Sequence, residues 1–280
     1  MSASITERLR AGTVLGAEGY VFELERRGYI KAGPFVPEVV LDYPDAVREL
    51  HREFLRAGAE VMVALTYYAH REKLRDVGRE GDLEAMNRRA VRIAREVARE
   101  GGALVAGNVC NTWAYDPEDP ATRDTVRAMY AEQVGWAAEE GVDFVISETN
   151  DYLREALIAR IRETVECAVA IQPVPYRTDA IAPTMETLLS PKGERAFPIE
   201  LDPFTCTRFD MAQFARQARE LGVDYIGICC GAGPHHVRAM AEALGREVPA
   251  SRYSPSLGLH PMFRDNVSAK DAAFLHSWNA

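Results

Sequence analysis

The chain repeats one pattern of polar and apolar positions. A charged amphipathic helix ends at a glycine, and the short apolar run that follows ends in polar or reactive residues. The glycine supplies the left-handed backbone conformation that ends a helix. The apolar runs are continuous rather than alternating, which is typical of parallel strands covered on both faces. Four strands of this kind are predicted at residues 61–66, 103–108, 142–148 and 225–230.

Two further strands are predicted at residues 13–17 and 167–174, so six strands alternate with helices. This alternation predicts an α/β protein with a parallel sheet. An open doubly wound sheet and a closed barrel share the pattern, but no G-x-G-x-x-G motif follows the first strand to indicate a dinucleotide-binding sheet. The sequence therefore favours a TIM-type parallel β/α barrel, formed as one domain by residues 1–280.

The stretch after the fourth strand is short. It has room for one helix, over residues 151–164, before the strand at 167–174 begins. A right-handed crossover through that helix makes the two strands parallel. We therefore expect the strand at 167–174 to lie next to the fourth strand in the sheet.

Parallel sheets and barrels carry their functional residues at the carboxyl ends of the strands. In this chain, acidic, aromatic, amide and thiol side chains occupy these positions. We expect the site to be drawn from this set, which contains Glu18, Gly19, Tyr67, Tyr68, Asn108, Cys110, Glu148, Gln172, Tyr176, Cys229 and Cys230.

Two adjacent cysteines, Cys229 and Cys230, end the strand at 225–230 and are followed by glycines and a helix start. Adjacent side chains on a regular strand point to opposite faces, so both thiols can reach one metal ion only where the strand ends and turns. Thiolates are soft ligands that select zinc among the common cellular metals. The pair is therefore either part of a zinc site or two small buried core residues.

The net charge of −9 argues against nucleic acid or an anionic membrane as a partner, because either requires a basic face. Small-molecule ligands are expected instead. The first ten residues lack the apolar segment of a signal peptide, and no apolar run approaches the roughly 20 residues that span a bilayer. An odd number of cysteines, five, suits reduced thiols better than disulfides. We expect a cytoplasmic protein.

Several stretches of the chain resemble the betaine–homocysteine methyltransferase family. Residues 225–242 are similar to the last strand and helix of the family, whose paired cysteines bind zinc. Residues 33–69 are similar, over most of their length, to its first two units. The strand that ends at Glu148 and the segment 172–176 also look like family segments. The resemblance covers nearly the whole chain and implies a zinc-dependent methyltransferase on a barrel.

The resemblance also implies roles for single residues. Zinc would bind the sulfur of homocysteine, and the resulting thiolate would attack a methyl group of betaine to give methionine. Glu148 matches the glutamate that holds the amino group of homocysteine, and Gly19 falls in the glycine-rich turn beside it. Tyr67 and Tyr68 match aromatic positions that face the methyl donor, and Phe35 stands where the family usually has tryptophan. A quaternary ammonium offers no proton, so π faces recognise it.

Each of these residues also has a purely structural interpretation. Tyr67 and Tyr68 suit the end of a buried strand, since aromatic residues favour strands. Glu148 could be a surface carboxylate, although it ends an apolar run. The residues alone leave both interpretations open.

The chain departs from the family in two places. The family's first strand normally ends in an aspartate followed by glycines, whereas here the acid is Glu18, shifted by one position, and we expect it to act in the aspartate's place. The family's fifth and sixth strands have no counterpart, so the predicted barrel is reduced to about six strands. A narrower barrel, an open sheet and closure by a second copy as a homo-oligomer are all compatible with this loss.

The missing units also remove the family's third zinc-binding cysteine. Cys206, which lies just before the start of a helix and whose segment leads into the unit that carries the pair, is the preferred replacement, and Cys110 after the third strand is the other thiol candidate. Cys167 begins a strand and should lie at the opposite end of the barrel. Water or an oxygen ligand could instead complete the site.

Three functions remain open at this point. The first is zinc-dependent methyl transfer from betaine or a related onium donor to the thiol of homocysteine. The second is a metal-free family member that acts as a binding or regulatory protein. The third is a demethylase of small quaternary amines on the same scaffold.

Overall fold

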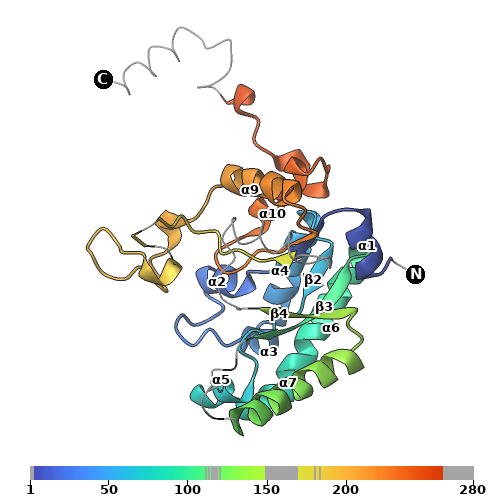
Figure 1. Ribbon diagram of the computed structural model, residues 1–280, viewed down its shortest axis with the longest axis vertical. Coiled ribbons are helices and arrows are strands. Elements are labelled where there is room, and N and C mark those ends of the chain that lie inside the picture. The colour runs from blue at the N-terminus through green and yellow to red at the C-terminus, as the bar shows by residue number, and fades with distance from the viewer. Residues whose placement is uncertain are drawn as a thin grey trace.

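The computed structural model describes residues 3–110, 112, 114, 119, 121–148, 170–179, 181–182 and 184–260. Within these ranges, six parallel strands form one sheet that curls into an open half-barrel (Figure 1). The six predicted strands are confirmed, most of them over shorter spans than the apolar runs. They are β1 (Val14–Ala17), β2 (Val61–Val63), β3 (Leu104–Cys110), β4 (Phe144–Glu148), β5 (Ala170–Ile171) and β6 (Tyr225–Ile226).

The strand order is β4-β3-β2-β1-β6-β5, so β4 and β5 lie at opposite edges of the sheet. β5 pairs with β6, and β6 in turn pairs with β1. The expectation that β5 lies beside β4 is therefore wrong. Closing six strands would require tilt and shear to change together, whereas pairing through β6 keeps β5 at the far edge. The helix predicted over residues 151–164 lies outside the described residues.

The helices pack against the sheet and against one another in the order α7, α6, α4, α10 and α9 (Figure 1). In α6, Leu83, Met86, Ala90, Ile93 and Val97 recur at spacings of three and four residues, and all are buried. This spacing gives the helix one apolar face. The α-helices are α1 (Ile5–Ala11), α2 (Tyr20–Arg26), α3 (Val39–Asp42), α4 (Pro44–Arg56), α5 (Arg71–Asp76), α6 (Leu83–Gly101), α7 (Ala121–Glu139), α9 (Arg208–Glu220) and α10 (Pro234–Ala243).

Short 3₁₀ helices lie in the connections. The segment between β5 and α9 contains two of them and extends away from the half-barrel (Figure 1). No helix in the described ranges is both long and apolar enough to cross a membrane. The 3₁₀ helices are η1 (Glu80–Asp82), η2 (Met185–Thr187), η3 (Asp202–Phe204), η4 (Pro249–Tyr253) and η5 (Leu257–Leu259).

Burial along the strands follows their place in the sheet. β1, β2 and β3 are buried along their whole length, as the continuous apolar runs predict. β4 instead alternates between half-buried and exposed positions, and Val145 is 38% exposed. The difference arises because β4 is an edge strand.

Candidate functional site

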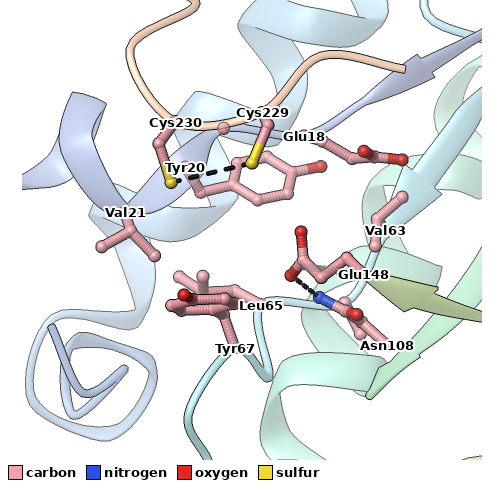
Figure 2. A pocket seen from close by; sticks show the side chains of 12 residues that line it. Glu18, Tyr20, Val21, Val63, Leu65, Tyr67, Asn108, Glu148, Cys229 and Cys230 are labelled. Atoms are coloured by element: carbon pink, nitrogen blue, oxygen red, sulfur yellow. Dashed lines mark hydrogen bonds between the residues drawn. The ribbon is translucent and has the colours of Figure 1, made fainter. Parts of the chain in front are cut away.

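The carboxyl ends of five strands enclose one small cavity (Figure 2). Side chains reach it from the ends of β1, β2 and β4, from within β3, and from the turn after β6. The site is therefore assembled even though β4 and β5 do not pair. The lining residues are Glu18, Gly19, Tyr20, Val21, Val63, Ala64, Leu65, Tyr67, Asn108, Glu148, Cys229 and Cys230.

The cysteine pair lies in a turn just after β6. The Cys229 N–H donates to the Pro173 carbonyl at 2.9 Å, and the Cys229 carbonyl accepts from the Ala232 N–H at 3.2 Å. The turn brings the two Sγ atoms to 3.8 Å, with both thiols pointing to the same side (Figure 2). Two thiolates bound to one tetrahedral zinc ion at about 2.3 Å lie about 3.8 Å apart. The pair thus fits two positions of a zinc site.

The surroundings of Cys229 favour the protonated form of its thiol. The Cys229 thiol donates to Cys230, and this bond together with burial raises the pKa of Cys229 well above its ordinary value. A nearby cation would lower the pKa of Cys229 again, because it favours the thiolate. The pair therefore suits a cation that binds sulfur.

Cys206 does not join the pair in the structure. Its N–H donates to the Pro175 carbonyl at 2.7 Å, and its own carbonyl lies 2.9 Å from His236 Nε2. These bonds hold the Cys206 segment against α10 rather than in the cavity. Among the described residues, no three His, Cys, Asp or Glu side chains are placed to hold one metal ion.

The alternative thiols give no third ligand in the described part of the chain. Cys110 is buried, its sulfur accepts the Tyr68 N–H at 3.2 Å, and burial raises the pKa of its thiol to about 12. Cys167 lies outside the described residues.

Glu18 is a buried carboxyl group, 3% exposed, at the end of β1. Its Oε1 accepts from Gln172 Nε2 at 2.7 Å and from the Tyr225 hydroxyl at 2.9 Å. Its Oε2 is buried with no hydrogen-bond partner in the described structure. Burial, and then the charge of Glu148, raise the pKa of Glu18 well above its ordinary value.

Glu148 ends β4 and points its carboxyl group into the cavity, although the residue as a whole is half-buried (Figure 2). Asn108 Nδ2 donates to Glu148 Oε1. Burial of the carboxyl group raises the pKa of Glu148 to about 7. Two carboxyl groups whose pKa values are raised in one cavity indicate a site that would be stabilised by a ligand cation.

The aromatic residues that resembled donor-binding positions divide between the cavity and the core. Tyr67 lines the cavity. Tyr68 packs against Tyr67, with ring centroids 4.1 Å apart and ring planes tilted by 33°, and does not line the cavity. Phe35 is buried against Phe22, with ring centroids 5.0 Å apart, and also lies outside the lining. Tyr68 and Phe35 both adopt positive φ angles, 58° and 52°, which non-glycine residues rarely do.

Sequence reasoning included Asn108 and Gln172 among the strand-end candidates without linking them to the two acids, and it missed Tyr225. Asn108 stood at a strand end, but nothing in the sequence linked it to Glu148. Tyr225 begins β6, so the strand-end rule passes over it. Its side chain reaches Glu18, at the end of the sheet that carries the cavity, because Gly16 on the neighbouring strand β1 leaves room for it. A Cβ added to Gly16 would lie 2.0 Å from the Tyr225 hydroxyl.

Gly19 is expected to be essential to the turn that presents the cysteines. Its φ is +81°, and an added Cβ would lie 2.7 Å from the Cys229 carbonyl oxygen. Gly28 is a matched control, because its φ is +80° and no atom lies within 4 Å of an added Cβ. Gly19→Ala should therefore cost about 1–3 kcal/mol more than Gly28→Ala in free energy of unfolding, measured by denaturant titration. Equal losses of free energy of unfolding in the two variants would show that the close approach of Gly19 to Cys229 does not affect stability.

The chain matches a protein family model and several known relatives. Residues 16–180 and 184–244 match the family model described as homocysteine S-methyltransferase. Betaine–homocysteine S-methyltransferase 1 of Rattus norvegicus is 36% identical over 322 residues, covering 91% of this chain and 79% of the relative. An S-methylmethionine–homocysteine S-methyltransferase of the same organism is 34% identical, covering 87% of this chain and 82% of the relative.

A solved structure shares the fold. The metallated form of the homocysteine methyltransferase MmuM from Escherichia coli superposes with a TM-score of 0.57 and 20% identity, covering 84% of this chain and 99% of that one. The alignment with the rat betaine enzyme spans more positions than this chain has residues, so that relative contains residues with no counterpart here. The chain belongs to the homocysteine S-methyltransferase family.

Proposed function

We propose that the protein transfers a methyl group from a small onium donor, betaine or a related compound, to the thiol of homocysteine. The observation that carries the proposal is the meeting of two thiols and two buried carboxyl groups in one cavity at the strand ends. A ligand that bears both a thiol and an ammonium group matches this combination.

The acceptor is held at two points. Glu18 and Glu148 provide carboxylate oxygens for the ammonium group, whose positive charge offsets the burial that raises both pKa values. The sulfur lies toward Cys229 and Cys230. Asn108 keeps Glu148 oriented through its bond to Oε1.

Zinc is part of the proposal. Cys229 and Cys230 would hold it, at the separation that suits two thiolate ligands. Bound zinc would lower the pKa of the acceptor thiol, so that a thiolate is available at neutral pH. Cys206, the candidate from sequence, would become the third protein ligand only if its segment moved from Pro175 and His236 toward the pair.

The donor presents a methyl group on a positively charged nitrogen or sulfur. Tyr67 offers an aromatic face in the cavity, and Tyr68, packed against it, fixes that ring. The thiolate attacks the methyl carbon in line, a C–S bond forms, and the bond from methyl to the onium atom breaks with its electron pair. With betaine, the products would be methionine and dimethylglycine.

The test combines turnover with metal analysis. The purified chain, prepared without chelator, is incubated with homocysteine and either betaine or S-methylmethionine, methionine is quantified, and zinc per chain is measured. We expect methionine with at least one donor and zinc near one equivalent. Zinc below about a tenth of an equivalent together with no methionine would contradict the proposal.

A metal-free binding protein is the second candidate. It is favoured by one observation, that the described residues place no third ligand beside the cysteine pair. Homocysteine binding by zinc-free protein, without turnover when zinc is supplied, would support it.

A further inference from the structure

Glu18 is held by two side chains that the proposed reaction does not use. Tyr225, from β6, and Gln172, just after β5, both donate to the same oxygen, Oε1, at 2.9 and 2.7 Å. Tyr225 is 4% exposed and Glu18 is 3% exposed. Because both donors use one oxygen, the second oxygen of the carboxyl group is left for another partner.

Two glycines make room for this arrangement. An added Cβ on Gly16 would lie 2.0 Å from the Tyr225 hydroxyl, and one on Gly227 would lie 2.7 Å from Glu18 Oε2 and 2.8 Å from Gln172 Cγ. Neither glycine has a positive φ, so neither is required by a turn. Their lack of a side chain instead leaves space for the group formed by Glu18, Tyr225 and Gln172.

The buried oxygen Oε2 of Glu18, which has no partner among the described residues, indicates a ligand that donates hydrogen bonds. Glu18 Oε2 is buried and has no partner in the described ranges, which is unfavourable for a carboxyl oxygen unless a ligand supplies a donor. Glu148, the other acid of the cavity, is close enough to raise the pKa of Glu18. A cationic N–H donor placed between them would relieve both the missing bond and the repulsion.

We propose that Tyr225 and Gln172 are positioning residues that fix Glu18 so that Oε2 accepts the amino group of the acceptor. They thereby set a preference for thiols that carry a primary amine. This inference rests on the proposed function, because it assumes that the cavity binds an amino thiol. The competing explanation is that Glu148 alone holds the amino group and that Tyr225 and Gln172 only stabilise the fold.

The test compares two thiols that differ in the amino group. Binding of homocysteine and of 4-sulfanylbutanoate, the same chain without the amine, is measured by titration calorimetry. Tyr225→Phe and Gln172→Leu each remove one donor to Glu18 and keep the shape of the side chain. We expect each variant to bind homocysteine about tenfold or more weakly and to bind 4-sulfanylbutanoate within about twofold of the original chain.

The matched control is Tyr130→Phe. The Tyr130 hydroxyl donates to the Cys110 carbonyl at 3.0 Å and lies outside the cavity lining, so its loss should leave both affinities unchanged. Thermal melts of all variants report any general loss of stability. A selective loss for homocysteine in two different variants cannot come from a loosened fold, which weakens both ligands.

The outcomes separate the inference from the function on which it rests. If the original chain binds neither thiol, the proposed function and the inference both fail. If it binds both thiols equally well, thiol binding stands and the inference is overturned. If the variants lose both ligands in parallel, or neither, Tyr225 and Gln172 do not position Glu18 for amine recognition.

Discussion

Replacing either cysteine of the pair with alanine is expected to remove zinc and methyl transfer together. The two Sγ atoms lie 3.8 Å apart in one turn, so each variant leaves a single thiolate where two can bind. Losing even a residue that supports a metal ligand typically costs about 10–100-fold in affinity or activity, so losing a ligand should cost more than about 100-fold. Zinc content by mass spectrometry and the rate of methionine formation measure the effect.

The Cys206→Ala variant tests whether Cys206 is the third zinc ligand. Because the Cys206 segment is tied to Pro175 and His236, the geometry predicts that this variant keeps its zinc. Zinc loss in Cys206→Ala would instead make Cys206 the third ligand and require its segment to move toward the pair. Unchanged zinc in both Cys229→Ala and Cys230→Ala would show that the pair is structural.

Most strands were predictable because they are buried on both faces, which gives them continuous apolar sequences. Continuous apolar runs mark strands covered on both faces, and β1, β2 and β3 are buried throughout. The run that forms β4 looks the same in sequence, yet β4 lies at an edge and Val145 is 38% exposed. Burial of an edge strand depends on what lies beside it, which local sequence does not specify.

The strand order was not predictable from spacing. The expectation that β5 follows β4 in the sheet rested on the short connection between them. Pairing is decided elsewhere, because β6 bonds to both β1 and β5. A short connection limits how far apart two strands can lie, but it does not make them neighbours.

The strand-end rule predicted most of the cavity. Glu18, Gly19, Tyr67, Glu148 and the cysteine pair all line it. The rule fails for Tyr225, which lies at the start of its strand. Its side chain extends past Gly16 and contacts Glu18. Such a reach depends on a missing side chain in the neighbouring strand, and a single sequence does not reveal which strands are neighbours.

Glu148→Gln is expected to weaken homocysteine binding by about 10–100-fold while zinc is retained. Glutamine keeps the oxygen that accepts from Asn108 and removes the negative charge that faces the ammonium group. Titration calorimetry and metal analysis separate the two effects. Zinc loss in this variant would make Glu148 a metal ligand instead. Glu247→Gln, which removes an exposed carboxyl group outside the cavity, is the control.

The same variant should change how stability depends on pH. Burial raises the pKa of Glu148 from its ordinary value near 4.5 to about 7, so between these values the folded chain holds a proton that the unfolded chain has lost. Stability therefore falls as pH rises through this window, because the unfolded state binds fewer protons. Glutamine does not titrate, so the original chain should lose melting temperature relative to Glu148→Gln between about pH 5 and about pH 8. His51, whose pKa is lowered to about 3 by burial, is present in both chains, so its contribution largely cancels. Glu18 adds to the difference in the same direction, because the charge of Glu148 raises its pKa only in the original chain. Parallel curves would mean that the Glu148 carboxyl group is solvated in the folded protein, and the cavity would then lack one of its two acids for the amino group.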